Sequence, residues 1–207
     1  MIGDNDTPFR LIVAAELAAM VSVRAYYSFF RGGGAIGERL RGRPEAIWLT
    51  TTLGMLALLH FGAVLAYIAW PSVLAWSVVR VAEPIRRVAI LVSCAGAVGE
   101  IWAAISLGAS YSPLLRVGKE QVLITAGAYR WIRHPLYAFG LPLMAGWGVA
   151  ARNWFITVTG ILVIVLAMII RAPREEAMML GVFGESYRAY ISRTRRFVPR
   201  LRRAGGK

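Results

Sequence analysis

Five long apolar blocks, separated by short polar or basic stretches, set the pattern of this chain. A helix that crosses a bilayer needs about 20 predominantly apolar residues. The blocks run over residues 9–30, 46–69, 88–107, 136–150 and 154–171, and the fourth is short. The sequence therefore predicts an all-α, polytopic transmembrane protein with about five spans.

The breaks between the blocks indicate where these helices end. A Trp-Pro pair at 70–71 closes the second block, and residues 72–84 are too short to cross and are expected at the membrane interface. An Arg-Asn pair at 152–153 makes a tight turn, so the fourth and fifth blocks are expected to form a helical hairpin. Residues 171–193 have amphipathic character. They predict a polar helical tail.

The composition agrees with a membrane protein and reduces the classes of partner that the protein is expected to bind. Apolar residues make up 57% of the chain and charged residues 17%, against roughly 25% charged in soluble proteins. The net charge of +13 does not indicate nucleic acid, because the basic residues flank apolar blocks and no nucleic-acid module is present. The single cysteine, Cys94, and two histidines offer no disulfide and no metal-ligand cluster. We therefore expect neither nucleic acid nor metal.

The distribution of basic residues predicts the orientation. With five spans, 18 of the 24 basic residues lie in the stretches 28–45, 109–134 and 171–207, which share one side. Positive residues favour the cytoplasmic side, so the C-terminus and the 109–134 connector are expected there. Arg80, Arg86 and Arg87 fit this topology poorly.

Residues 127–137, G-A-Y-R-W-I-R-H-P-L-Y, form the most distinctive polar motif. Pro135 disfavours helix before it and is tolerated in a first turn, which predicts that a helix begins at Pro135 or Leu136. Arg133 and His134 would then lie at a helix N-terminus, where free N–H groups attract a carboxylate or phosphate. The alternative is a basic loop that flanks the membrane.

A second polar cluster begins at the end of the fifth block and is expected on the same side. Arg171 and Glu175 are four residues apart, so they can pair on one helix face. Glu175 and Glu176 are adjacent, so one is expected to face a pocket and the other solvent or Arg174. Tyr187 and Tyr190 share a face. The alternative is an interfacial helix on anionic lipid.

Five features follow one another along the chain: V-L-I-T-A-G-A-Y-R-W-I-R-H-P-L-Y, an apolar hairpin, E-E, F-G-E-S-Y-R-A-Y and V-P. In this order they resemble the isoprenylcysteine carboxyl methyltransferase family. That family belongs to a wider group that includes phospholipid N-methyltransferases. The resemblance covers about Leu107 to Pro199. It implies one membrane methyltransferase domain over residues 1–207, with variable N-terminal spans in 1–87 and a cofactor-binding catalytic core in 88–200.

The resemblance implies S-adenosylmethionine as the methyl donor. Tyr129, Arg133 and His134 would donate to its carboxylate, and Glu175 or Glu176 would accept from its ammonium or ribose hydroxyls. The full set of residues implied for the cofactor is Tyr129, Arg133, His134, Pro135, Leu136, Tyr137, Glu175, Glu176 and Tyr187. This site is expected to open to the cytoplasm.

The implied acceptor is lipophilic and enters from the bilayer, as an isoprenylcysteine carboxylate does. A carboxylate is already ionised, so transfer needs orientation rather than a base; Arg171, with Glu175 beside it, is the candidate for positioning it. Glu100 and Tyr190 are weaker substrate candidates. The alternatives left open are a phospholipid amine acceptor, a sterol-reductase-like NADPH enzyme, and a non-enzymatic lipid-binding protein.

Several polar and aromatic residues inside the blocks carry structural expectations. Glu100 would be costly to insert as an unpaired charge, so a partner such as Arg24 is expected, and Glu16 is similar. His60 is expected to be a hydrogen-bonded packing residue. The tryptophans near span ends are expected to anchor the interface; they are Trp48, Trp70 and Trp147.

Overall fold

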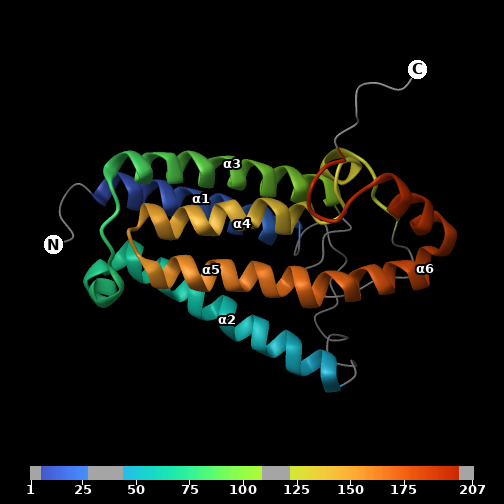
Figure 1. Ribbon diagram of the computed structural model, residues 1–207, viewed down its shortest axis with the longest axis horizontal. Coiled ribbons are helices and arrows are strands. Elements are labelled where there is room, and N and C mark those ends of the chain that lie inside the picture. Colours follow the sequence, from blue (N-terminus) through green and yellow to red (C-terminus); the bar gives the residue numbers. More distant parts are fainter. Residues whose placement is uncertain (1–5, 28–43, 109–121, 201–207) are drawn as a thin grey trace.

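The computed structural model describes residues 6–27, 44–108 and 122–200, with backbone only for 44–50. Within these residues the long elements are helices. They are α1 (Thr7–Ala25), α2 (Pro44–Ala69), α3 (Glu83–Leu107), α4 (Pro135–Ala150), α5 (Trp154–Leu166) and α6 (Ala172–Arg193). Helices α1, α3, α4 and α5 run along one axis, while α2 is inclined to them and α6 bends back at one end (Figure 1). The predicted all-α fold and the helical hairpin are confirmed. The expected end of the first block, at residue 30, lies outside the described residues.

The end of the bundle opposite α6 is closed by a compact turn region. Residues 72–84, expected at the interface, overlap the 3₁₀-helix η3 (Pro71–Ser77) and reach the start of α3. Asn153 caps α5 by accepting from the backbone N–H of Ile156 at 3.0 Å, and its amide donates to the Ser77 hydroxyl at 2.8 Å. Arg152 makes the hairpin turn with a positive φ of 53°. The predicted Arg-Asn turn is therefore tied directly to η3.

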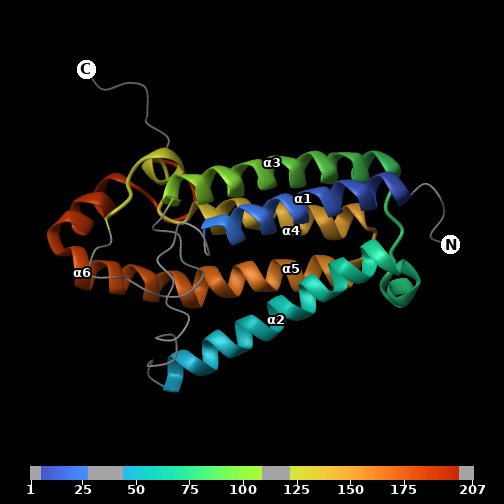
Figure 2. The same ribbon diagram turned by 180° about the vertical axis from the view of Figure 1, so that it is seen from behind.

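Helices α3 and α4 approach closely because glycines line their contact. A Cβ atom added at Gly146 would lie 2.7 Å from the carbonyl oxygen of Ala89, and one at Gly96 would lie 2.7 Å from the backbone nitrogen of Leu143. Small residues commonly allow such contact between helices in membranes. Helix α1 packs on α3, and α2 packs on α5, which completes the bundle (Figure 2).

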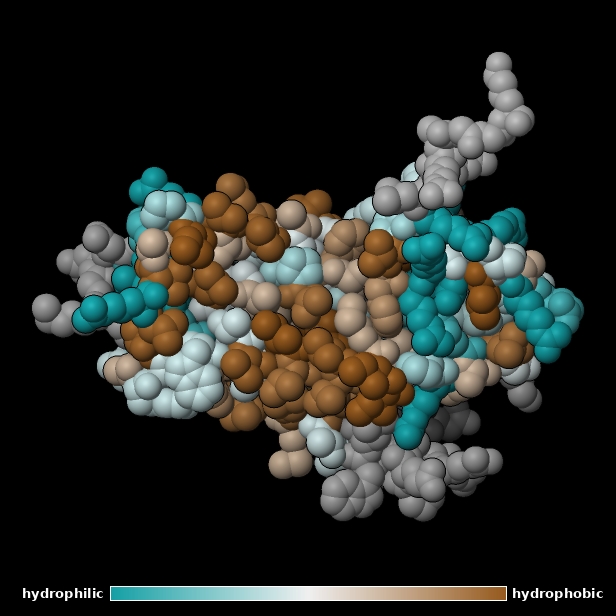
Figure 3. Space-filling view, viewed as in Figure 1, coloured by the Kyte–Doolittle hydropathy of each residue, from teal (hydrophilic) through white to brown (hydrophobic). Residues whose placement is uncertain are grey.

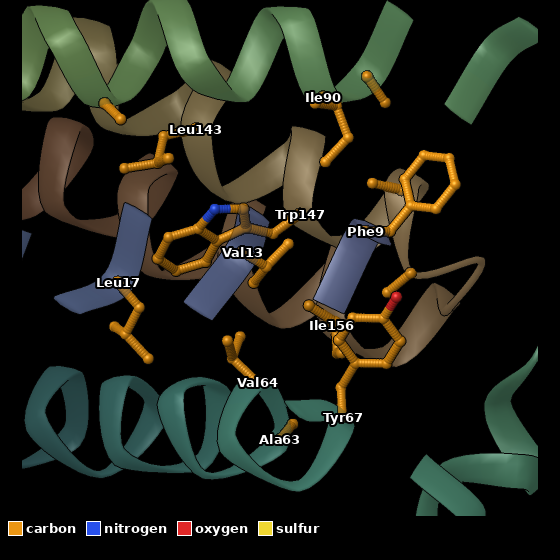
Figure 4. Close-up of a cluster of buried hydrophobic side chains, with 14 of the residues drawn as sticks. Phe9, Val13, Leu17, Ala63, Val64, Tyr67, Ile90, Leu143, Trp147 and Ile156 are labelled. Carbon is orange, nitrogen blue, oxygen red and sulfur yellow. The ribbon is translucent and has the colours of Figure 1, made fainter. Parts of the chain in front are cut away.

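Trp147 occupies the centre of the core and is not an interface anchor, so that expectation is wrong. Its side chain is 1% exposed and lies beside Val13 and Leu143 (Figure 4). The indole N–H donates to Glu16 at 2.5 Å, which gives both buried groups a partner. Trp70, in contrast, is 71% exposed, and the side chain of Trp48 lies outside the described residues.

His60 packs within the bundle as expected. It is fully buried, and its Nδ1 lies 3.1 Å from the hydroxyl of Thr159. Its ring stacks parallel to the indole of Trp147. The histidine therefore joins the internal polar contacts of the core.

The surface supports an integral membrane protein. Apolar residues form a broad band between hydrophilic ends (Figure 3). Three helices among the described residues are long and apolar enough to cross a membrane; they lie in Thr51–Ala69, Glu83–Leu107 and Trp154–Arg193. Helices α1 and α4 run alongside them (Figure 1). A count of five spans stays a prediction.

One of the arginines that fit the predicted topology poorly, Arg86, is a buried and paired residue. Its guanidinium is fully buried, 2.5 Å from Asp6 and 2.8 Å from the carbonyl oxygen of Ala150. Arg152 also contacts Asp6, at 2.8 Å. Arg86 is therefore neutralised inside the protein, which weakens its effect on orientation, and Arg152 shares the same carboxylate.

We predict that Gly146→Ala destabilises the bundle, because the new methyl group would meet the backbone of Ala89. Overpacking of this kind costs about 1–3 kcal/mol, seen as a lower Tm in detergent. Gly62→Ala is the matched control, since nothing lies within 4 Å of a Cβ atom there. Equal melting temperatures for the two variants would contradict the close contact of α3 and α4.

Candidate functional site

The distinctive motif forms one wall of a polar cluster at the end of the bundle. A short 3₁₀-helix, η5 (Gly127–Arg130), precedes it, and α4 begins at Pro135 with His134 as its N-cap residue, as predicted. The side chains of Tyr129, His134 and Pro135 are buried. The motif is therefore a packed element and not a free basic loop.

The second wall comes from the helix that continues α5. A single π-helical turn, η6 (Ala167–Arg171), leads into α6, and the helix continues through Pro173. Such turns often occur at functional sites. Arg171 donates to Glu175 at 2.8 Å, so the predicted pair is confirmed.

The chain then folds back onto the motif. Gly184 interrupts α6 with a positive φ of 49°, and the helix curves back across the end of the bundle (Figure 1). The backbone N–H groups of Arg133 and His134 donate to the carbonyl oxygens of Arg195 and Arg196, each at 2.9 Å. These backbone bonds hold the C-terminal segment against the start of α4.

Both glutamates converge on His134, which corrects the expectation that one of them faces solvent or Arg174. Glu175 lies 3.4 Å from Nδ1 and Glu176 lies 3.2 Å from Nε2. Adjacent helix residues point about 100° apart. Because the two nitrogens lie on different edges of the ring, one imidazole can fill the space between two carboxylates that diverge.

Three arginines surround the two glutamates. Arg133 donates to Glu176 at 2.9 Å and Arg196 donates to it at 2.7 Å, while Arg171 binds Glu175. Three positive charges against two negative ones leave an excess of one, and of two when His134 is protonated. The cluster is therefore electropositive, which favours an anionic ligand.

The pKa of His134 reflects two opposed effects. Burial alone would lower it, but hydrogen bonds that the ring donates to Glu175 and Glu176, together with their negative charges, outweigh burial and raise the pKa above the ordinary 6.5. The imidazolium form is thus favoured in the folded protein. When protonated, the ring links the two carboxylates as a cation.

The remaining implied cofactor residues surround this cluster. Tyr137 donates its hydroxyl to Glu175 at 2.9 Å, and Leu136 packs beside Tyr129. Tyr187 and Tyr190 are both buried, with ring centroids 5.8 Å apart. Their burial shows that these tyrosines do not form a membrane-facing aromatic belt.

Two of the weaker substrate candidates lie in different places. The Tyr190 hydroxyl donates to the carbonyl oxygen of Tyr129 at 2.6 Å, so it ties α6 to the motif. Glu100 is not part of the glutamate cluster. It pairs with Arg24 at 2.5 Å, which confirms the partner expected for it.

Sequence reasoning missed Arg196 and Phe197. Arg196 contacts Glu176 through two nitrogens, at 3.0 and 2.7 Å, and the ring of Phe197 lies 5.6 Å from that of His134. The basic run before V-P was visible. Nothing local, however, distinguishes the arginine that turns inward from its neighbours.

We predict that stability falls as the pH rises through the raised pKa of His134. The pairing of its cation is fully present below the ordinary pKa of 6.5 and is lost above the folded-state value. Melting temperatures of the detergent-solubilised protein between pH 5 and 9 would show this decline, and His134→Gln would flatten it. An unchanged profile in the variant would contradict the charged state of His134.

Comparisons with known proteins agree with the resemblance seen in the sequence. Residues 85–186 match the phospholipid methyltransferase family model. A protein-S-isoprenylcysteine O-methyltransferase of Schizosaccharomyces pombe is 26% identical over 162 residues, which cover 75% of this chain and 67% of that protein.

A solved structure shares the fold. It is that of the eukaryotic intramembrane Ras methyltransferase ICMT, with a TM-score of 0.57 and 17% identity over 94% of this chain and 68% of the other. With the motifs and the sequence matches, this confirms the resemblance: the chain is a membrane methyltransferase that is similar to the isoprenylcysteine carboxyl methyltransferase family.

Proposed function

We propose that this protein transfers a methyl group from S-adenosylmethionine to a lipophilic acceptor, in the first place the carboxylate of an isoprenylcysteine-like molecule. The observation that carries the proposal is the electropositive cluster in which His134 joins Glu175 and Glu176 among three arginines. The names of the relatives support the same reaction.

The cluster has the donors and acceptors that the cofactor requires. S-adenosylmethionine would supply the electrophilic methyl group, and its amino-acid end carries both a carboxylate and an ammonium. Arginines and glutamates stand side by side in the cluster, so each of these charges can find a partner. The fit requires that some internal ion pairs exchange for pairs with the ligand, and such exchange is easiest at exposed groups.

Exposure within the cluster differs from one residue to the next. The side chain of Arg196 is 47% exposed, while those of Arg171 and Glu175 are about a quarter exposed. His134 and Arg133 are nearly buried. Arg196 and Glu175 would therefore exchange partners with the cofactor and Arg171 with the acceptor, whereas His134 and Arg133 would hold the frame.

Methyl transfer to a carboxylate acceptor requires few catalytic groups from the protein. The carboxylate is ionised at neutral pH, so methyl transfer to it moves no proton and the residues need only orient it and exclude water. Arg171 lies where α5 leaves the apolar band and enters the cluster. We assign it to positioning the acceptor carboxylate.

The site and the C-terminus are proposed to face the cytoplasm, where S-adenosylmethionine is made. Residues 122–137 and 171–200 lie at one end of the bundle (Figure 2). At the other end, Arg86 and Arg152 are paired with Asp6. The positive-inside rule supports this orientation, because 18 of the 24 basic residues of the sequence lie in stretches expected on this side.

A phospholipid amine is the second candidate acceptor, and the match to the phospholipid methyltransferase family favours it. An amine must lose a proton before it can attack, so Glu175 would then act as a base. Methyl transfer from labelled cofactor to prenylcysteine analogues and to aminophospholipids, assayed in parallel, separates the two acceptors.

We predict that S-adenosylhomocysteine binds the detergent-purified protein, measured by calorimetric titration with NADPH as a comparison ligand. His134→Ala and Glu175→Ala should each weaken binding about tenfold or more, equal to about 1.4 kcal/mol. Glu185→Ala is the matched control, because Glu185 lies on the same helix and its side chain is 82% exposed. Absence of wild-type binding at millimolar ligand would refute the proposed cofactor.

We predict that Arg171→Ala lowers kcat roughly 10²-fold, as expected when a reacting group loses its orientation. The affinity for S-adenosylhomocysteine should change much less. Arg188→Ala serves as control, since Arg188 pairs with Glu185 on the exposed face of α6. A variant that loses cofactor affinity and keeps its turnover at saturating cofactor would show that Arg171 binds the cofactor instead.

A further inference from the structure

Arg24 and Glu100 form an ion pair between two apolar helices, outside the cluster described above. Arg24 lies in the last turn of α1, and its guanidinium is 2.5 Å from the carboxylate of Glu100 on α3. The side chain of Arg24 is 34% exposed and that of Glu100 only 3%. A charge at the centre of a spanning helix costs roughly 2.5–3.5 kcal/mol, so such residues are commonly functional.

The pair lies just below the cluster, on the membrane side. Glu100 reaches α4 at Gly140, where its Oε1 lies 2.7 Å from the position of an added Cβ atom. Gly140 is three residues after Tyr137, a rise of about 4.5 Å along a helix. Because Tyr137 bonds Glu175, Glu100 contacts α4 at a position about 4.5 Å further along the helix than the residue that joins the cluster.

Tyr137 connects the pair to Arg171. The charges of both Arg171 and Arg24 act on its hydroxyl, so the two guanidinium groups lie within electrostatic range of one point on α4. Arg171 is held by Glu175, and Arg24 by Glu100. Two arginines, each with its own buried or half-buried carboxylate, therefore flank the start of α4.

The unequal exposure of the pair indicates what it can bind. Glu100 is enclosed and Arg24 is the accessible partner. A guanidinium binds a carboxylate through a planar fork of donors. A lipophilic molecule that enters from the bilayer with its charged head toward the cluster would present an anion to Arg24 at this depth, while Glu100 fixes the guanidinium.

We propose that Arg24, held by Glu100, binds the anionic head of the acceptor and gives the enzyme its preference for acids over neutral or cationic lipids. This inference rests on the proposed function and names a second cation for its acceptor site. Glu100 is a positioning residue here, because it acts through Arg24.

The test measures direct binding of two probes, a farnesyl thioether that ends in a carboxylate and its primary amide, to the purified full-length protein. Arg24→Gln should weaken binding of the acid about tenfold and leave the amide within about threefold. Arg24→Lys, which keeps the charge, should retain part of the preference. Glu100→Gln leaves the guanidinium without its charged anchor, so acid binding should weaken less than in Arg24→Gln, and amide binding should stay within about threefold.

The difference between the acid and the amide probe separates this role from a structural one. If the ion pair only stabilised the fold, Arg24→Gln and Glu100→Gln would shift both probes in the same direction, and that result would overturn the inference. Arg10→Gln is the matched control, because Arg10 also lies on α1 but binds the carbonyl oxygen of Ile68. Arg24→Lys and Glu100→Gln decide the question where Arg24→Gln does not fold.

Titration with S-adenosylhomocysteine distinguishes failure of this inference from failure of the proposed function. Its affinity should be unchanged in all the variants of Arg24 and Glu100. A wild-type protein that binds S-adenosylhomocysteine but shows the same acid preference after Arg24→Gln contradicts only the role of Arg24. A wild-type protein that does not bind it contradicts the proposed function.

Discussion

A charge inside a membrane bundle must find its partner within the protein, because lipid offers none. This constraint shapes the described parts of the chain from end to end. Arg86 forms an ion pair with Asp6 at one end of the bundle, and Glu100 forms one with Arg24 further along. At the other end, the two adjacent glutamates of α6 pair with arginines and a histidine. The helices therefore pack in positions where these charged side chains can pair.

The ion pairs differ in how readily their partners can be replaced, and this difference separates pairs that hold the structure from pairs that can bind a ligand. Arg86 is fully buried and also bonds a carbonyl oxygen, so its contacts are fixed. Arg196 and Arg171 are partly exposed, so water or a ligand can replace the carboxylates they bind. A buried pair that loses one partner is strongly destabilised. Partly exposed pairs can exchange at lower cost, which suits a site that binds and releases a charged cofactor.

The site exists because two distant segments are held together by their backbones. The N–H groups of Arg133 and His134 bond the segment that follows α6, and the Tyr190 hydroxyl bonds the carbonyl oxygen of Tyr129. These neutral contacts fix the frame without using the charged side chains. The charged groups of Glu175 and its neighbours are then positioned by rigid elements, which is the condition for orienting a reacting group.

The sequence by itself determined the features that depend on local chemistry. Proline placed the start of α4 at Pro135, and helical spacing paired Arg171 with Glu175. The motifs also indicated the family, because their order along the chain is specific. Only the tertiary structure decided that Trp147 is central and that Arg196 turns inward. The physical reason is that spacing and caps are properties of one helix, whereas burial and charge pairing depend on which other helices lie against it.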